Sequence, residues 1–146
     1  MLLKLLTLQQ KWATKKVLAL FVIGYSIFPL YLLPKILPEG RPLDLHLYYS
    51  PAQAYNLIES YGEFNRASYI VGSATIDMLY PLVYATFLGL VLSFFIVRIY
   101  PKHDKCQLVS LFPYSILLTD ILENLAIITM FSIFHQRNDL LTLIAS

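Results

Sequence analysis

Three long apolar stretches determine the solvent in which this chain folds. They cover approximately residues 17–33, 69–97 and 108–134. Each stretch is long enough for an α-helix to cross the ~30 Å hydrocarbon core of a bilayer. The composition agrees, since 58% of the 146 residues are hydrophobic and 14% are charged, which is more apolar than an ordinary soluble domain. The sequence therefore predicts an all-α membrane protein, a small transmembrane helical bundle that forms one domain over residues 1–146 within the lipid bilayer.

The first stretch, VLALFVIGYSIFPLYLL, follows several lysines and resembles the start of a secretory signal. No small-x-small cleavage site follows it, so we interpret it as a retained helix. Pro29 and Pro34 each lack a backbone donor, which predicts a kink or an end there. The final segment, LLTLIAS, is too short to cross a bilayer. A new apolar run after a polar turn favours a truncated fourth span over a short tail.

The second and third stretches are joined by the short basic loop RIYPKHDK, so we expect an antiparallel helix pair. At about 29 residues, the second span exceeds the hydrocarbon thickness and must tilt, kink or protrude. Pro81 lies inside it and predicts a kink at that position.

The connection over residues 35–68 contains signals for a short helix over about 51–61. Ser50 and Gln53 fit a capping box, Pro51 fits the first helical position and Gly62 fits the end. The apolar positions recur at helical spacing, which is typical of an amphipathic helix at the membrane interface. These positions are Ala54, Tyr55, Leu57, Ile58 and Tyr61, and we expect an aromatic belt at headgroup level from Tyr48, Tyr49, Tyr55, Tyr61 and Tyr69.

The positions of the basic residues predict the orientation of the chain. Seven flank the side of the N-terminus and the 98–107 turn, and four flank the other side, so the former is expected in the cytoplasm and the 35–68 connection outside. The seven are Lys4, Lys11, Lys15, Lys16, Arg98, Lys102 and Lys105, and the four are Lys35, Arg41, Arg66 and Arg137. A net charge of +2 with dispersed basic residues argues against nucleic acid as a partner. Cys106 is the sole cysteine, which excludes an internal disulfide and a cysteine-based metal cluster.

Polar residues inside the second and third spans form the candidate site. Asp77 lies roughly 12 Å from the outer end of its span and Glu123 roughly 16 Å from the same surface, at ~1.5 Å rise per residue, with Asp120 one turn deeper. Asp120, Glu123 and Asn124 share one face of the third span, and Asp77, Tyr80 and Tyr84 share one face of the second. Because an acid facing lipid costs ~2.5 to 3.5 kcal/mol, we expect these acids to face each other, Tyr25 or a water-filled cavity.

Two chemical interpretations of this acid seam, defined as Asp77, Asp120, Glu123 and Asn124, stay open. Either one or more carboxyls keep their protons through bonds to Tyr80, Tyr84 and Asn124, or a cation binds between Asp77, Asp120 and Glu123. A hard divalent metal suits such an all-oxygen set. Zinc fits less well, because His46, His103 and His135 lie near the surfaces and apart.

Two functions of different class follow from the acid seam. The first is a buried carboxylate site in the outer half of the bilayer that binds a proton, a cation or a small or lipid ligand, with Asn124, Tyr80 and Tyr84 fixing its orientation. The second is an accessory subunit whose acids recognise a partner transmembrane helix or a second copy of the chain. Asn124 by itself is more typical of a hydrogen bond between helices. No motif identifies a cofactor or a reaction, so whether the protein is an enzyme stays open.

The order YSPAQAYNLIESYG, DMLYPLVYATF and DILENLAI resembles a group of small bacterial multi-spanning membrane proteins of unassigned function, over about 47–134. The placement of Asp77 and Pro81 in the second span is also similar in architecture to the EXPERA-domain proteins, four-helix sterol isomerases and sterol-binding relatives. The resemblance to this second family implies the fold only. The histidine and tryptophan of an isomerase pocket are absent from the spans, since Trp12 lies before the first one.

Overall fold

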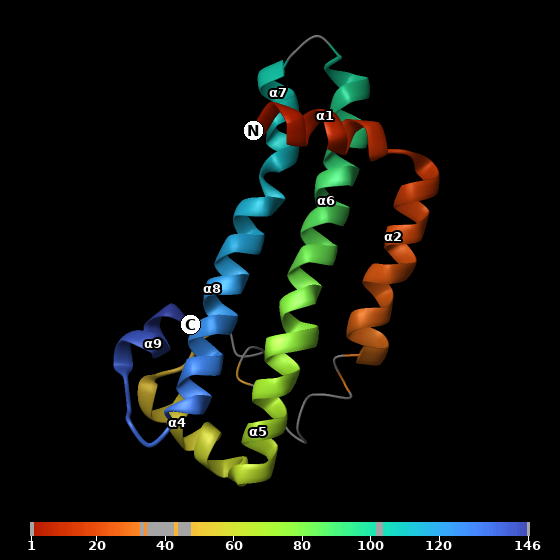
Figure 1. The fold of residues 1–146 in the computed structure, drawn as a ribbon. Coiled ribbons are helices and arrows are strands. Elements are labelled where there is room, and N and C mark those ends of the chain that lie inside the picture. Colours follow the sequence, from red (N-terminus) through yellow and green to blue (C-terminus); the bar gives the residue numbers. More distant parts are fainter. Residues whose placement is uncertain (1, 33, 35–42, 44–47, 102–103, 146) are drawn as a thin grey trace. The chain divides into compact units, whose positions relative to one another are not determined.

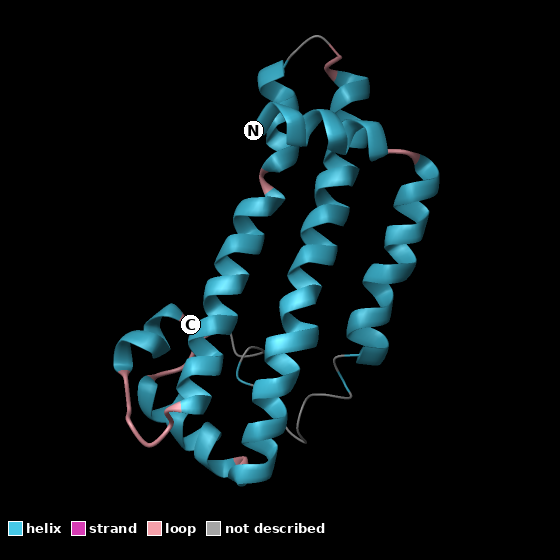
Figure 2. Cartoon of the chain, in the orientation of Figure 1, coloured by secondary structure: helices cyan, strands magenta, loops and turns pink. Residues whose placement is uncertain are grey.

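The computed structural model describes residues 2–32, 34, 43, 48–101 and 104–145, and within them every regular element is a helix (Figures 1 and 2). The chain divides into two compact units. Unit 1 comprises Met1–Pro29 and Tyr80–Leu118, and unit 2 comprises Leu30–Leu79 and Thr119–Ser146. His46 and His103 lie outside the described residues, as does much of the 35–47 segment.

Among the described residues, three helical runs are long and apolar enough to cross a membrane, as the sequence predicts. The first is Lys15–Leu32, the second is Gly62–Ile99 and the third is Lys105–Ser132. The first consists of α2 (Lys15–Ile27) and a π-helical turn, Phe28–Leu32, which begins one residue before Pro29. The expected irregularity at Pro29 is therefore present as a widened turn. The three spans confirm a small all-α membrane bundle.

The second span is one continuous helical run of 38 residues. It contains α5 (Gly62–Gly72), the π-helical turn η3 (Ser73–Asp77) and α6 (Met78–Ile99). Pro81 lies inside α6, where it lacks the N–H that would bond the carbonyl oxygen four residues earlier, that of Asp77. The departure from α-helical geometry thus ends at Asp77, one turn before the proline.

Unit 1 contains a helix that was not expected from the sequence. This helix, α1 (Leu2–Trp12), lies across the ends of α6 and α7 (Figure 1), and Thr14 caps the start of α2 by accepting a hydrogen bond from the Val17 N–H. The remaining elements of this unit are α7 (Asp104–Leu108), the 3-10 turn Val109–Leu111 and the first turns of α8 (Pro113–Ser132).

Unit 2 confirms the predicted short helix, α4 (Pro51–Ser60), with both bonds of its capping box. The Gln53 N–H donates to Ser50 Oγ at 3.3 Å, and the Ser50 N–H donates to Gln53 Oε1 at 2.8 Å. Gly62 follows with φ of +69°, the left-handed conformation that glycine adopts most easily. Local sequence signals therefore determine both ends of this helix.

The predicted aromatic belt is wrong for four of its five tyrosines. Tyr48 is exposed, but the other four are buried in the core of unit 2, and Tyr69 stacks on Phe131 with ring centroids 4.4 Å apart. Tyrosine suits an interface and a core equally well, because its ring is apolar and its hydroxyl needs one partner. The four are Tyr49, Tyr55, Tyr61 and Tyr69.

The apolar face of α4 packs inside the protein, where Ala54 and Ile58 are fully covered. The segment near the chain end forms α9 (Asp139–Ile144), which packs on α4. The Tyr49 hydroxyl donates to the Ala145 carbonyl, and the Asn138 N–H donates to the Tyr55 hydroxyl at 2.8 Å. Buried tyrosines thus connect these two short helices by hydrogen bonds.

Candidate functional site

Asp120 and Asn124 of α8 lie on the face of the helix that packs inside unit 2. Asp120, Asn124 and Ile127 follow each other at spacings of four and three residues, and Ile127 and Asn124 are buried. The opposite face presents Leu122 and Leu125, which are 51% and 48% exposed. The Asp120 carboxyl group therefore lies on the protein-facing side of α8 and not on its open apolar side.

Asn124 connects α8 to the π-helical turn of the second span. Its Nδ2 donates to the backbone carbonyl of Asp77 at 3.3 Å. That carbonyl is the one that Pro81 cannot bond, so the asparagine supplies the donor that the proline removes. The hydrogen bond between helices expected of Asn124 is thereby confirmed. It also brings the backbone of Asp77 to the level of Asn124 and its neighbour Glu123.

The carboxyl groups differ from the prediction in their burial. Asp77, Asp120 and Glu123 are each partly exposed, and none of the three is buried. The reason lies in where the core of unit 2 begins on α8. The core residues on α8 are Ala126, Ile127, Met130 and Phe131. Asp120 and Glu123 precede them along the helix and therefore lie at the edge of the packed region.

The two tyrosines predicted to orient a ligand belong to unit 1, where they pack against other aromatic rings. The centroid of Tyr80 lies 5.5 Å from that of Tyr84 and 5.9 Å from that of Tyr25. Phe28 is 5.5 Å from Tyr80, and Phe87 is 5.8 Å from Tyr25. The sequence predicts Tyr25 as one possible neighbour of the acids, and the contacts found for it are with Tyr80 and Phe87. A contact between Tyr25 and the acids stays a prediction. A ligand-orienting role for Tyr80 and Tyr84 stays a prediction.

A metal centre receives no support from the arrangement of the ligand-type side chains. Within the described residues, no group of three or more His, Cys, Asp and Glu side chains is placed to hold a metal ion. Asp77, Asp120 and Glu123 are therefore not gathered as a three-carboxylate metal site. His135 is exposed at the end of α8.

A second polar cluster, in unit 1, is absent from the sequence predictions. Gln9 of α1 is buried, and its Nε2 donates to the Gly89 carbonyl at 2.6 Å, to Ser93 Oγ at 2.9 Å and to the Ser110 carbonyl at 3.0 Å. We call these four residues the Gln9 junction. A Cβ added at Gly89 would lie 3.0 Å from Gln9 Nε2. Glycine at this position therefore leaves room for the Gln9 side-chain amide.

Comparisons of the chain with protein-family models, with curated proteins and with solved structures found no match. The two resemblances seen in the sequence therefore stay resemblances. The assignment of function has to rest on the geometry and chemistry of the chain itself.

Proposed function

We propose that this multi-pass membrane protein binds a cationic organic ligand, such as an amine, at the acid seam. The observation that carries the proposal is the Asn124 bond to the Asp77 carbonyl at 3.3 Å. It ties the second span to the third beside Glu123, with Asp120 one turn away on the same covered face of α8. Carboxyl groups on two spans then lie at one level of the bundle.

Partial exposure of the acids supports a binding role. Asp77, Asp120 and Glu123 each keep exposed surface, so a ligand can reach them. Because the surroundings are apolar, the attraction between a carboxylate and a cation is stronger here than in water. An amine suits the site better than a metal ion, since it needs no cage of three ligands.

The π-helical turn provides a further argument for function at this level. Such turns are uncommon, and they often occur where a helix carries a functional residue. This turn ends at Asp77, and its last carbonyl accepts the Asn124 bond. A carboxyl group at the end of an irregular turn can be presented in a direction that regular helical geometry would not allow.

The test compares octylamine with its neutral analogue N-octylacetamide, both added to the purified protein in detergent micelles. Both compounds carry N–H donors and similar chains, so a difference between them isolates the positive charge. We expect octylamine to raise the Tm by about 4 °C or more, and Asp120→Asn with Glu123→Gln to remove that shift. The matched controls are Glu59→Gln and Glu63→Gln, which alter exposed acids on α4 and α5. An equal response to both compounds would refute the proposal.

The alternative function is recognition of a partner transmembrane helix by the same acids. The partial exposure of Asp120 and Glu123 at the edge of the unit 2 core favours this alternative. A basic side chain from a partner helix could bind the exposed part of these carboxyl groups. A poly-leucine transmembrane peptide with one central lysine serves as the probe. If it raises the Tm while octylamine and an all-leucine peptide do not, the partner interpretation replaces the ligand interpretation.

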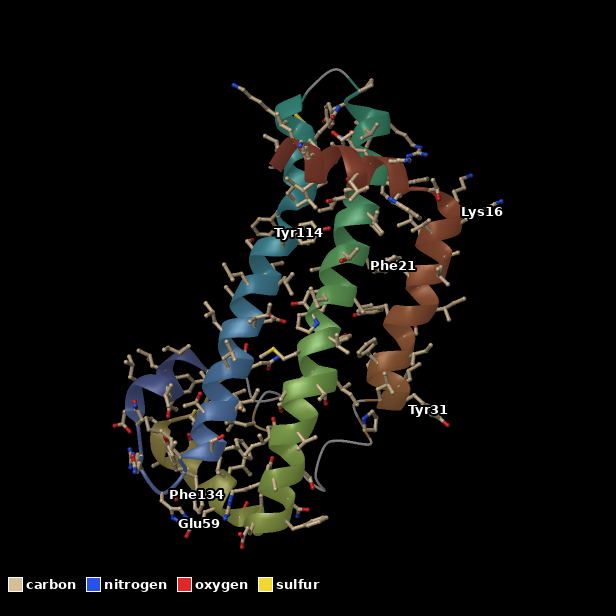
Figure 3. The ribbon with its side chains drawn as sticks, in the orientation of Figure 1. Lys16, Phe21, Tyr31, Glu59, Tyr114 and Phe134 are labelled. Carbon is tan, nitrogen blue, oxygen red and sulfur yellow. The ribbon has the colours of Figure 1, made fainter. Side chains whose placement is uncertain are left out.

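We further propose that the N-terminus and the 98–107 turn face the cytoplasm. Cys106 lies in that turn and is partly exposed, so a membrane-impermeant maleimide should label it only after the cells are permeabilised. In a Cys106→Ser background, Glu59→Cys should be labelled in intact cells, because Glu59 is exposed on α4 (Figure 3). The reverse labelling pattern would invert the proposed orientation.

A further inference from the structure

Unit 1 contains a cavity of about 290 Å³, just below the range of about 300 to 1,000 Å³ that is usual for small-ligand sites. Its wall is formed by α1, the start of α2, the middle of α6 and the start of α8. Phe21 of α2 and Tyr114 of α8 lie beside α6 (Figure 3). The cavity has room for part of an amphiphile, such as a segment of one acyl chain.

The wall of this cavity is mainly apolar. Three polar residues contribute to it, and each has a hydrogen bond within unit 1. Thr86 and Tyr114 are joined through their side chains, and the Gln9 amide nitrogen donates to three acceptors. An occupant is therefore held chiefly by apolar contacts. The apolar lining residues are Leu5, Leu8, Trp12, Val17, Phe21 and Leu90.

The cavity is open along one face of α1. Leu5, Leu8 and Trp12 follow each other at spacings of three and four residues, so they share this face. All three line the cavity, yet they are 38%, 54% and 55% exposed. Side chains that line a cavity and keep this much exposed surface lie at its opening. An acyl chain can therefore enter from the side of α1.

A second pocket, of about 270 Å³, contains a cationic side chain. Its lining residues are Lys11, Trp12, Thr14 and Val17. Trp12 and Val17 line the apolar cavity as well, so the two pockets adjoin. Lys11 itself is exposed, and its ammonium group is accessible to a ligand. An apolar cavity next to a pocket with a cation matches an amphiphile whose polar end is negatively charged.

The charge of the whole unit favours the same kind of ligand. Unit 1 contains seven lysines and arginines and one acidic residue, Asp104. Among the described residues, no ion pair is found for Lys4, Lys11, Lys15 or Lys16. Basic residues on one side of a membrane protein also determine its orientation, but orientation does not require an apolar cavity beside them. Clusters of lysines next to a membrane span are typical of binding to anionic lipids.

We propose that unit 1 binds an acidic phospholipid, with one acyl chain in the apolar cavity and its phosphate beside Lys11. The lysine ammonium group supplies a positive charge and three donors for the phosphate oxygens, and Lys15 and Lys16 add to the attraction. A zwitterionic lipid fits less well, because its own cationic group offsets the charge of the phosphate. The site uses residues of unit 1 alone and recognises a negative charge, whereas the acid seam is proposed to bind a positive one.

Trp12 is the chain's only tryptophan and lines both pockets, so its fluorescence reports on a lipid bound there. The probes are phosphatidylglycerol and phosphatidylcholine with the same brominated acyl chain, since bromine quenches tryptophan fluorescence on contact. Each is titrated into vesicles of unlabelled phosphatidylcholine that contain the purified protein. We expect phosphatidylglycerol to reach half-maximal quenching at a mole fraction at least about fivefold lower, which is the preference that one lysine near an anionic lipid provides.

Two lysine variants separate a defined site from general attraction to basic residues. Lys11→Gln removes the charge from the second pocket and should weaken quenching by brominated phosphatidylglycerol by about fivefold. Lys105→Gln removes the same charge from an exposed position on α7 outside both pockets, and should leave the titration unchanged. Equal losses in the two variants would overturn the proposal, because attraction to the basic surface as a whole would then account for the preference.

A pair of variants on α2 tests whether the acyl chain occupies the cavity. Val17→Phe fills part of the cavity and should weaken quenching by brominated phosphatidylglycerol, whereas Val22→Phe, the same change at an exposed position outside the lining, should not. Equal quenching in these two variants would refute occupation of the cavity.

Two measurements on the unaltered protein stand even if Val17→Phe misfolds. Glycerol 3-phosphate carries a phosphate without an acyl chain, and at millimolar concentration it should not reverse the quenching. Reversal by this compound would indicate a site for a soluble phosphate and would contradict a role for the cavity. Identical titrations with the two brominated lipids would show that Trp12 contacts bulk lipid without recognition of its charge.

Discussion

The Gln9 junction and the acid seam are two polar places in a chain made mostly of apolar residues, and they are accommodated in opposite ways. Gln9 is 5% exposed, with three hydrogen bonds to residues at least 80 positions away. The carboxyl groups of the acid seam keep part of their surface exposed. A neutral amide can be enclosed once its donors are bonded, whereas enclosing a carboxylate costs much more. The first arrangement therefore suits stability and the second suits binding.

The largest expected effect tests the structural role of the Gln9 junction. Gln9→Leu keeps the approximate volume but removes the donor to two carbonyls and to Ser93 Oγ. We expect the free energy of unfolding, measured in mixed detergent and SDS micelles, to fall by about 3 kcal/mol. The control is Thr7→Val on the exposed side of α1, where the hydroxyl bonds only the Leu3 carbonyl of its own helix. A loss no larger than that of the control would show that the junction contributes little.

The next effect concerns the close approach of α1 to α6 at Gly89. A Cβ there would lie 3.0 Å from Gln9 Nε2 and 3.3 Å from the Ser110 carbonyl oxygen, so Gly89→Ala should destabilise the protein by about 1 to 3 kcal/mol through overpacking. Gly24→Ala is the matched control, since a Cβ at Gly24 meets no heavy atom within 4 Å. It should be neutral or stabilise α2 by up to about 1 kcal/mol. Equal unfolding free energies for the two variants would contradict the tight junction.

These two regions also differ in how far the sequence could predict them. The spans and the capping box of α4 follow from signals within a few residues of each other, such as the apolar runs and the pair Ser50 and Gln53. The polar residues of the acid seam were evident for the same reason, because carboxyl groups inside an apolar run are conspicuous. Their partial exposure was not predictable, since it depends on where the packed core begins along α8.

The Gln9 junction had no comparable local signal. Gln9 stands in a polar, basic segment, and its partners come from α6 and from the turn before α8, so their meeting depends on tertiary packing. The buried tyrosines show the same limit. Tyr69 packs on Phe131, which is 62 positions away along the chain, and its local sequence fits a membrane interface equally well. Pro81 predicted an irregular helix but not its form, a π-helical turn that ends at Asp77.

A smaller effect tests the bond that links Asn124 to the second span. Asn124→Ala removes the donor to the Asp77 carbonyl, and hydrogen bonds between membrane helices contribute about 0.6 kcal/mol on average and about 1.7 at most. In a Pro81→Ala background, the restored N–H can bond that carbonyl within the helix. The cost of Asn124→Ala should therefore be smaller there. A double-mutant cycle on the unfolding free energy measures this coupling, and additivity of the two changes would refute it.

The smallest expected effect applies to the carboxyl groups themselves. If the acid seam serves binding and not folding, Asp120→Asn and Glu123→Gln should change the unfolding free energy by no more than about 0.5 kcal/mol each without ligand, as substitutions at partly exposed positions usually do. The side chains keep their shape, lose the negative charge and exchange one acceptor oxygen for an NH₂ donor. The measurement is the same SDS titration, with Glu63→Gln at an exposed position as the reference. A loss comparable to that of Gln9→Leu would make the seam a structural element like the junction, and the contrast between the two regions would disappear.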